Sequence, residues 1–163
     1  MNELHHAEFQ SPIGIVEIVG TDEAIISILF SEKNRVDYPI SPDSPQVIVD
    51  CQQQLEEYFK GQRMEFDFPV TSTGTPFQQK VWAALTEVPY AETVSYGAIA
   101  KAIGSDKAVR AVGNANSKNK LTIVVPCHRI IGSTGKLTGY AGTLTRKEWL
   151  LRHEKEFAKT PKP

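Results

Sequence analysis

The sequence predicts an α+β protein built from two small domains, and three observations support this prediction. Residues 9–30 are rich in Ile and Val on both sides of a turn, which is typical of an antiparallel hairpin. Residues 44–61 carry apolar side chains at helical spacing. The second half of the chain alternates short helical patterns with Gly, Ser and Asn turns. We therefore expect a small N-terminal antiparallel sheet with one helix (residues 1–70) and a mainly helical, winged-helix-like C-terminal domain (residues 71–163).

The helix of the N-terminal domain has recognisable ends. Ser44 is a suitable N-cap, with Pro45 at the first helical position, and Gly61 is a suitable stop. Cys51 lies on the apolar stripe of this helix, so we assign it to the core, without a chemical role. Residues 63–68 alternate between polar and apolar side chains and predict a further strand.

Two short helices in the second half of the chain form a helix-turn-helix pattern. Ser95 caps the first helix, residues 96–103, and Gly104 ends it. Ser105 is expected to cap the second, residues 106–115, which carries small residues and two basic ones. Helical pairs of this kind also occur in proteins that do not bind DNA, so the pattern alone leaves both interpretations open.

The remaining segments of the second half have simpler patterns. Residues 69–74, rich in Thr, Ser and Gly, predict a linker, and a helix is expected over 75–87. Residues 114–120 are polar and predict a loop that leads into a strand ending at Pro126. Thr145 and Glu148 have the spacing of a capping box at the start of the last helix.

Charge is divided unevenly along the chain, although the formal net charge is only −1. Residues 1–70 hold 13 Asp and Glu against 4 Lys and Arg, and residues 71–163 hold 6 against 14. This asymmetry favours contact between the C-terminal part and phosphates, unless the charges mix on the folded surface. The sequence has no apolar run of membrane-spanning length and no visible secretory signal. Its two cysteines do not form a disulfide framework, so we expect a cytoplasmic, reducing setting.

The run Pro126-Cys127-His128-Arg129 is the strongest chemical signal in the sequence. A thiolate is a good nucleophile, and neighbouring basic groups raise its population. The alternative is a buried structural cysteine at a strand end, because neighbours in sequence need not face each other. Glu154 adds to the signal, because its helical neighbours on both sides are apolar: Leu150, Leu151, Phe157 and Ala158. A carboxylate on such a face needs a partner, and His128 is a suitable one.

Three further motifs accompany these residues: Ser95-Tyr96, Arg110-Ala111-Val112-Gly113 and Lys147-Glu148-Trp149-Leu150-Leu151. Together they resemble the motifs of the O6-alkylguanine-DNA alkyltransferases. Proteins of this family repair DNA by moving an alkyl group from guanine onto their own cysteine. The resemblance covers residues 75–154, about half of the chain, with four motifs in the family's order.

The resemblance implies a mechanism for this chain. Cys127 would be the alkyl acceptor, with His128 and Glu154 completing a Cys-His-Glu arrangement, and Tyr96 would bond the base as the guanine oxygen leaves. Each molecule would react once, because the thioether product is stable. The target nucleotide would be flipped out of the duplex after binding in the minor groove.

The resemblance also implies two sets of contacts. Residues expected to touch DNA are Arg110 (the family's arginine finger), Tyr96, Gly97, Ser105 and Ser133. Residues expected to line or support the substrate pocket are Asn119 (the family's hinge asparagine), Ile130, Tyr140 and Ala141. The family often has serine at the position of Ala141, so a hydroxyl contact is lost here. Taken alone, Tyr96 is better explained by a helix–helix contact, and Arg110 can be explained by a phosphate contact or a solvated charge.

Partners and cofactors follow from the same reasoning. We expect double-stranded DNA containing O6-alkylguanine as the partner, with O4-alkylthymine and cooperative binding left open, and a monomeric protein without membrane contact. No cofactor is expected, and no metal either, because residues 1–70 have no Cys-x-x-Cys pair. Two rival functions remain: a cysteine hydrolase or peptidase using Cys127 and His128, and a DNA-binding regulator with a redox-active thiol.

Overall fold

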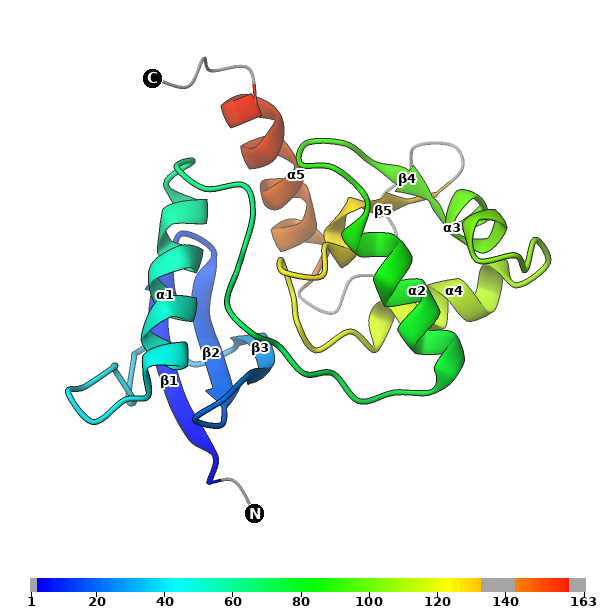
Figure 1. Ribbon diagram of the computed structural model, residues 1–163. Coiled ribbons are helices and arrows are strands. Elements are labelled where there is room, and N and C mark those ends of the chain that lie inside the picture. Colours follow the sequence, from blue (N-terminus) through cyan, green and yellow to red (C-terminus); the bar gives the residue numbers. More distant parts are fainter. Residues whose placement is uncertain (1–2, 133–142, 159–163) are drawn as a thin grey trace. The chain divides into compact units, whose positions relative to one another are not determined.

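The computed structural model describes residues 3–132 and 143–158 and confirms the α+β fold class. The chain divides into two compact units, Met1–Ser72 and Thr73–Pro163. Figure 1 shows the first unit as a sheet with a helix, and the second as mainly helical. No helix within the described ranges is both long and apolar enough to cross a membrane.

The sheet of the first unit has three antiparallel strands, β1 (His5–Ser11), β2 (Gly14–Gly20) and β3 (Ile25–Ser31), in that order. The hairpin predicted around residues 20–23 joins β2 to β3, and the amide of Thr21 donates to the carbonyl of Ala24 across its turn. Strand β1 was not predicted, because its sequence contains two His, a Glu and a Gln instead of an apolar alternation.

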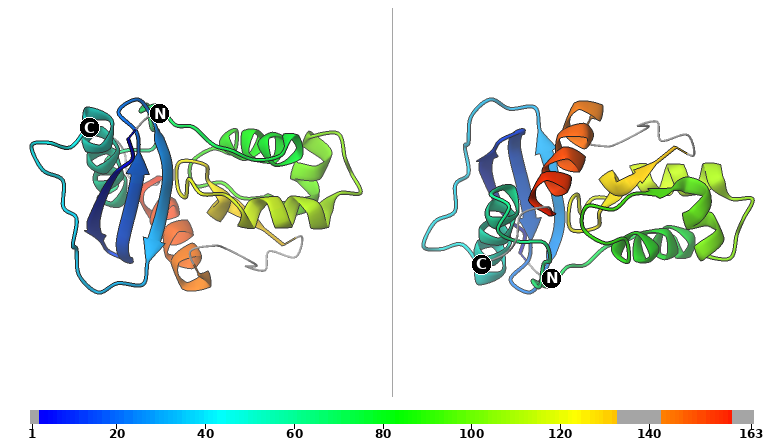
Figure 2. Two further views of the ribbon diagram at one scale, coloured as in Figure 1. Left: turned by 90° about the horizontal axis from the view of Figure 1, so that it is seen from below. Right: turned by 90° about the horizontal axis from the view of Figure 1, so that it is seen from above.

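Helix α1 (Gln46–Phe59) covers one face of this sheet, as Figures 1 and 2 show. Its apolar stripe is buried, and the stripe includes Cys51, as predicted. The expected cap at Ser44 is wrong: the Ser44 hydroxyl instead accepts from the amide of Ser41, and the helix begins after Pro45 without a side-chain cap. Gly61 has φ +77, which suits glycine and ends the helix as expected.

The strand predicted over residues 63–68 does not form. Two hydrogen bonds join the side chain of Gln54 on α1 to Asp67, one to its carboxylate and one from its amide. The ring of Phe66 lies 5.8 Å from that of Tyr58 on the same helix. Polar and apolar side chains do alternate in this segment, but the aromatic rings pack on α1 and the backbone does not join the sheet. The first backbone pairing with the sheet is the bridge between Val70 and Ile25.

The second unit contains four α-helices and a short parallel pair of strands within its described part. They are α2 (Pro76–Thr86), β4 (Val94–Ser95), α3 (Tyr96–Ala102), α4 (Val109–Ser117), β5 (Ile130–Ile131) and α5 (Leu144–Ala158). Helices α2 and α4 pack against each other. The indole N–H of Trp82 on α2 donates to the carbonyl of Ala115 on α4 at 2.8 Å, so it ties the two helices together inside the core.

Helices α3 and α4 form the predicted helix-turn-helix, with corrections at α4. The Ser95 hydroxyl caps α3 by accepting from the amide of Ala98 at 3.0 Å, and Gly104 has φ +78. Ser105 does not cap α4, because residues 106–108 make one more turn before the helix begins. Helix α4 then continues to Ser117, so the first part of the predicted loop 114–120 is helical.

The strand predicted before Pro126 is also replaced by turns. Ile123 has φ +72, and the amide of Val124 bonds locally to the carbonyl of Thr122. The side chains of this run are buried except for the half-buried Val124, so the run is apolar for packing reasons and not because it joins a sheet. These turns lead into η1 (Cys127–Arg129), a single 3-10 turn.

The last helix starts earlier than the predicted capping box. Helix α5 begins at Leu144, so Thr145 lies inside it. The hydroxyl of Thr143 accepts from the amide of Arg146 at 3.4 Å and takes the place of the predicted cap.

Helix α2 begins with a capping box. The Thr75 hydroxyl accepts from the amide of Gln78 at 3.1 Å, and the Gln78 side chain accepts from the amide of Thr75 at 3.0 Å. Thr75→Ala removes the first bond and should lower the free energy of unfolding by about 1 kcal/mol. Urea unfolding measures this, and Thr75→Ser should retain most of the stability. Equal losses in both variants would show that the hydroxyl is not the stabilising group.

Candidate active site

Cys127 is fully buried at the first position of η1. Burial raises the pKa of its thiol to about 11, although a hydrogen bond from Asn119 and the positive charge of Lys147 act in the opposite direction. At neutral pH the sulfur is therefore mainly a thiol, and its conversion to thiolate requires a base or a stronger stabilising contact.

Asn119 presents its amide N–H₂ to the sulfur. Its Nδ2 lies 3.1 Å from Cys127 Sγ and 3.0 Å from the carbonyl of Val125. Its Oδ1 accepts from the amide of Leu121 at 3.0 Å, which fixes the direction of the carboxamide. The group therefore donates to Cys127, a contact that stabilises a thiolate more than a thiol.

His128 and Glu154 form the pair that the sequence predicted. His128 Nε2 lies 2.6 Å from Glu154 Oε2, and both side chains are fully buried. Burial lowers the pKa of His128 below its ordinary value, although the nearby carboxylate favours the charged form. The neutral imidazole then carries its proton on Nε2. Its Nδ1 has no hydrogen-bond partner among the described residues, so it is a buried acceptor available to a proton.

Glu154 accepts hydrogen bonds from Arg129 and from the backbone amide of Ala91 as well as from His128. Arg129 donates from Nε to Oε1 at 2.8 Å and from a terminal nitrogen to Oε2 at 3.0 Å, and the amide of Ala91 donates to Oε1 at 3.2 Å. Burial by itself would raise the pKa of this carboxyl, but His128 and Arg129 outweigh it and hold the pKa below its ordinary value. Glu154 is therefore an ionised carboxylate in the interior of the second unit.

Arg129 is a structural member of the site that the sequence analysis did not assign. Besides the carboxylate, it donates to the carbonyl of Val88 at 2.7 Å, and its guanidinium lies 5.6 Å from the ring centre of Tyr90. It therefore ties the segment after α2 to η1 and α5. Its position directly after the Cys-His pair was the signal that could have identified it.

Lys147 is the second residue that the sequence analysis missed. It lies in the first turns of α5, is fully buried, and donates from Nζ to the carbonyl of Ile130. Burial lowers the pKa of this amine to about 8, while the proximity of Cys127 acts to raise it. A lysine at this depth is rare unless it has a function or a partner, but the helical pattern alone did not show that it faces inward.

The residues predicted to touch DNA lie on or beside the helix-turn-helix. Tyr96 begins α3 and is half-buried, Gly97 is exposed, Ser105 is half-buried in the turn, and Arg110 is exposed on α4. Arg110 has no carboxylate partner among the described residues, whereas Arg35, Arg63, Arg129 and Arg152 each have one. An unneutralised arginine on an exposed helix face is suited to an anionic partner.

Two of the predicted pocket residues, Asn119 and Ile130, lie within the described part of the chain. Ile130 is fully buried beside the cysteine turn, and Asn119 contacts the sulfur as described above. Ser133, Tyr140 and Ala141 lie outside the described residues. Gly113 on α4 faces the ring of Tyr96, where an added Cβ would lie 3.6 Å from the nearest ring carbon, so α4 approaches this tyrosine closely.

Two domains of one protein family match this chain. The ribonuclease-like domain of 6-O-methylguanine DNA methyltransferase matches residues 4–71, and the DNA binding domain of the same family matches residues 76–156. The chain belongs to the 6-O-methylguanine DNA methyltransferase family.

Relatives in this family match over nearly the whole chain. The methylated-DNA–protein-cysteine methyltransferase of Methanosarcina acetivorans is 46% identical over 153 residues, covering 93% of this chain and 98% of the relative. The constitutive enzyme of Bacillus subtilis is 43% identical, covering 93% and 95%. The crystal structure of the Mycobacterium tuberculosis OGT in complex with DNA is 44% identical, with a TM-score of 0.83 and 94% of each chain covered.

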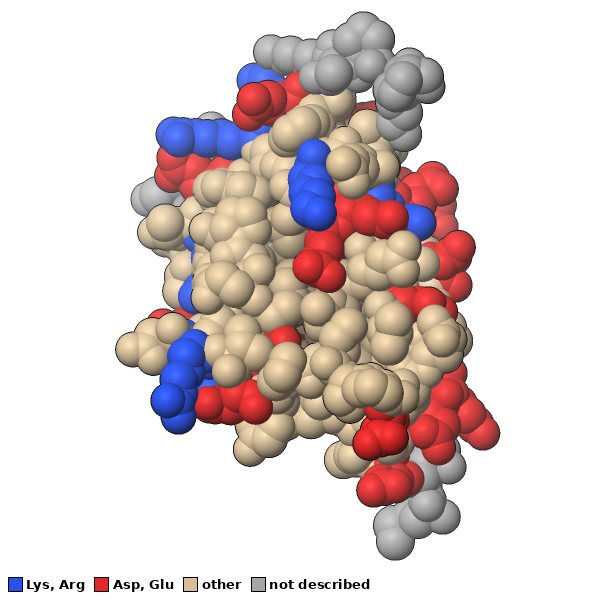
Figure 3. Space-filling model, turned by 90° about the vertical axis from the view of Figure 1, so that its left-hand side faces the viewer, with Lys and Arg blue, Asp and Glu red and all other residues tan. Residues whose placement is uncertain are grey.

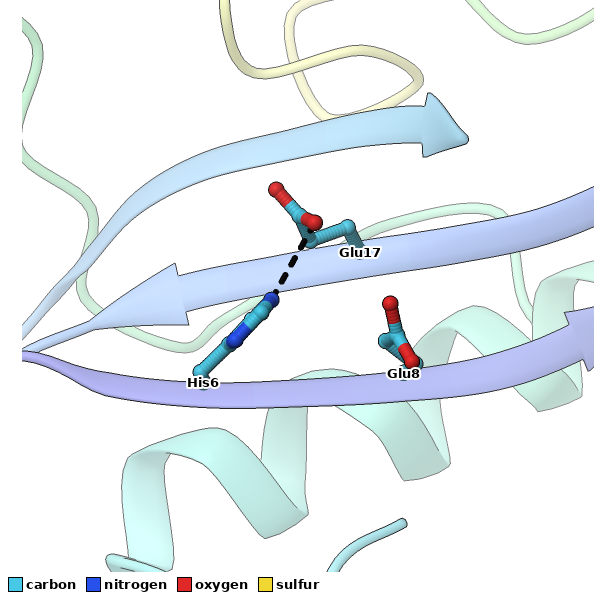
Figure 4. A group of neighbouring side chains, drawn as sticks. All are labelled: His6, Glu8 and Glu17. Carbon is cyan, nitrogen blue, oxygen red and sulfur yellow. Dashed lines mark ion pairs between the residues drawn. The ribbon is translucent and has the colours of Figure 1, made fainter. Parts of the chain in front are cut away.

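One group in the first unit has the composition of a metal site. His6, Glu8 and Glu17 offer ligand atoms within 4.8 Å of one another on β1 and β2 (Figure 4). Glu8 is however already bound by the amine of Lys33 at 2.8 Å and by the backbone amides of Asp37 and Tyr38. The ammonium group of Lys33 therefore occupies the carboxylate that a metal ion would need. We interpret His6, Glu8 and Glu17 as part of an ion-pair network. The absence of a resident metal stays a prediction.

The charge asymmetry of the sequence corresponds to the two units. All charged residues of 1–70 fall in the first unit, which therefore carries the acidic excess. In the view of Figure 3, Asp and Glu side chains lie mainly along the right-hand and lower edges, and the middle of this face is largely uncharged. The basic excess lies in the second unit, where the family's DNA binding domain also matches.

The Glu154 network predicts a large loss of stability for Glu154→Gln. The variant leaves the charge of Arg129 buried without its counter-ion, which should cost about 3 kcal/mol or more in unfolding free energy at pH 7. The carboxyl pKa is lowered in the folded state, so its contribution is complete above about pH 5, where the unfolded carboxyl (pKa about 4.3) is also ionised, and is lost as the pH falls further. The difference from wild type should therefore shrink from about pH 5 to pH 2 in urea titrations.

The exposed Glu156 on the same helix supplies the control for this experiment. Glu156→Gln should leave stability unchanged within about 0.5 kcal/mol. A similarly small effect for Glu154→Gln would contradict the role assigned to the buried carboxylate.

The Lys147 contact predicts a slower reaction of Cys127 with iodoacetamide. Lys147→Met removes a positive charge that lowers the thiol pKa, so the pKa should rise above its value of about 11. The wild-type amine is charged mainly below its pKa of about 8, and the difference in rate should be largest there. Mass spectrometry of the modified peptide over a pH series measures the effect, with the exposed Lys155→Met as control. Superimposable pH profiles would show that Lys147 does not act on the thiol.

Proposed function

We propose that this protein repairs alkylated DNA by transferring the alkyl group from the O6 atom of guanine to the sulfur of Cys127. The observation that carries the proposal is that the buried thiol of Cys127 is followed directly in the chain by a buried, neutral imidazole, which an ionised carboxylate holds through its Nε2 atom. The relatives of this chain include methylated-DNA–protein-cysteine methyltransferases, whose name describes transfer from methylated DNA to a protein cysteine, and this supports the same reaction here.

The transfer requires one proton to leave the thiol and one to reach the guanine. The Nδ1 atom of His128 accepts the thiol proton, directly or through one water, while Glu154 holds the Nε2 proton and stabilises the imidazolium that forms. The sulfur then forms a bond to the alkyl carbon as the carbon–O6 bond breaks. The electron pair stays on the guanine oxygen, and a proton from the site restores neutral guanine.

Asn119 and Lys147 act on the charge of the sulfur. Asn119 donates to Sγ at 3.1 Å, and the positive charge of Lys147 favours the thiolate. Both effects act against burial, which alone keeps the thiol neutral. The site therefore protects a neutral cysteine at rest and stabilises the anion that attacks.

The target base must leave the duplex to reach this site. Cys127 is fully buried, and a guanine stacked inside DNA cannot present its O6 atom to it. We propose that α3 and α4 bind the minor groove, that Arg110 occupies the space left by the flipped nucleotide, and that Tyr96 bonds the extruded base. The exposure of Arg110 and the close approach of α4 to Tyr96 support these roles.

The reaction is proposed to occur once per molecule. A thioether is stable, and no group described at the site offers a route to cleave it. We propose a monomer as the active species, within the cell, with O6-alkylguanine as the lesion. The acceptor domain is residues 71–163, and residues 1–70 carry the acidic charge.

Intact-protein mass spectrometry after mixing with a duplex that holds one O6-methylguanine tests the proposal. We expect every active molecule to gain the mass of one CH₂ group on Cys127, with one guanine restored for each. Undamaged duplex and Cys127→Ala should give no gain. Continued turnover beyond one lesion per protein, or DNA binding without any gain in mass, would contradict the proposed reaction.

A further inference from the structure

Helix α4 and its C-cap present an exposed ridge that consists of Arg110 and Asn114 on the helix and Lys118 at the cap. These residues are four apart, so each lies about 40° and 6 Å further along the helix than the last. The opposite side of the helix is buried through Val112 and Ala115. The ridge therefore forms the outer surface of the second helix of the helix-turn-helix.

The ridge side chains have no internal role among the residues that the structure describes. Arg110, Asn114 and Lys118 have no side-chain hydrogen bond or ion pair there, unlike two neighbours of Asn114. The Ser117 hydroxyl donates to the carbonyl of Asn114 at 2.8 Å, and the Asn116 amide donates to the carbonyl of Cys127 at 3.4 Å. Helix α4 also contains no acidic residue, so the ridge is positive at two positions and has a neutral amide between them.

The carboxamide of Asn114 can both donate and accept hydrogen bonds, whereas the Arg and Lys side chains on either side of it can only donate. Arg and Lys neutralise phosphates without reading the sequence. In the minor groove, guanine alone presents a donor, its N2 amino group, next to the N3 acceptor that every purine has. An Asn side chain can donate from Nδ2 to N3 and accept at Oδ1 from N2, so it matches guanine with two bonds and adenine with one.

We propose that Asn114 is a specificity-determining residue, which contacts the minor-groove edge of a guanine in the base pairs flanking the lesion. This inference rests on the proposed function, because it requires α4 to enter the minor groove. Under it, the protein repairs lesions in some sequence contexts faster than in others, and the preference depends on the amide of Asn114.

Replacement of single guanines by deoxyinosine tests this proposal directly, because deoxyinosine lacks only the N2 amino group. The second-order rate of alkyl transfer to the sulfur is measured on duplexes with one O6-methylguanine, in which each guanine within three base pairs is replaced in turn. At one position the replacement should slow wild type by about fivefold or more. The Asn114→Ala variant should react at the same rate with the guanine duplex and with the duplex that has deoxyinosine at that position. The slowing by deoxyinosine that wild type shows and the variant lacks then measures the contact between Asn114 and the guanine N2 amino group.

A matched control is Gln53→Ala, which removes an exposed carboxamide from helix α1. It should retain the wild-type inosine effect. Thermal unfolding should show Asn114→Ala folded, since alanine is the better helix former. The specificity claim is overturned if no position responds to inosine in wild type, or if Asn114→Ala keeps the same response. It is also overturned if Asn114→Ala slows all duplexes equally, as a phosphate contact would. Failure of transfer with every duplex would instead contradict the proposed function itself.

Discussion

The buried carboxylate of Glu154 is the constraint on which the site depends. It accepts hydrogen bonds from His128, from two nitrogens of Arg129 and from the backbone amide of Ala91. These partners come from η1 and from the segment after α2, so one ionised group on α5 holds three parts of the second unit together. An unpaired carboxylate could not remain charged at this depth, and each partner is therefore required by the others.

The same carboxylate determines what His128 can do. Because Glu154 occupies Nε2, the imidazole has only Nδ1 to offer, and burial keeps this nitrogen unprotonated until a proton is transferred to it. Cys127 is kept as a thiol by the same burial, while Asn119 and Lys147 reduce the cost of the anion. A resting site of this kind reacts slowly with small electrophiles, because the sulfur is mainly a thiol, yet it needs little reorganisation when a substrate carbon is presented to the sulfur.

Much of this arrangement could be predicted from the sequence, for identifiable physical reasons. Glu154 was assigned a buried partner because its helical neighbours are apolar, and a regular helix makes that inference safe. The turns around Ile123 could not be foreseen in the same way, because a buried β-branched run has the same pattern whether its backbone pairs in a sheet or turns on itself.

Lys147 and Arg129 were missed for a different reason. Their side chains are long and charged, and whether they face inward depends on partners that only the folded chain supplies. Lys147 donates to the carbonyl of Ile130, and Arg129 donates to Glu154. In both cases the partner is distant in sequence. The start of α4 was misplaced because Ser105 is a good cap by type, but the turn after Gly104 continues for three more residues.

The protonation state that Glu154 imposes on His128 can be measured by ¹⁵N NMR of the His128 imidazole across a pH titration. We expect a neutral ring protonated on Nε2 at pH 7, with Nδ1 showing the shift of an unprotonated nitrogen, and a pKa below the ordinary histidine value. Glu154→Gln should alter both the tautomer and the titration. An imidazolium at pH 7, or a ring protonated on Nδ1, would contradict the claim that Glu154 prepares His128 to accept the proton of Cys127.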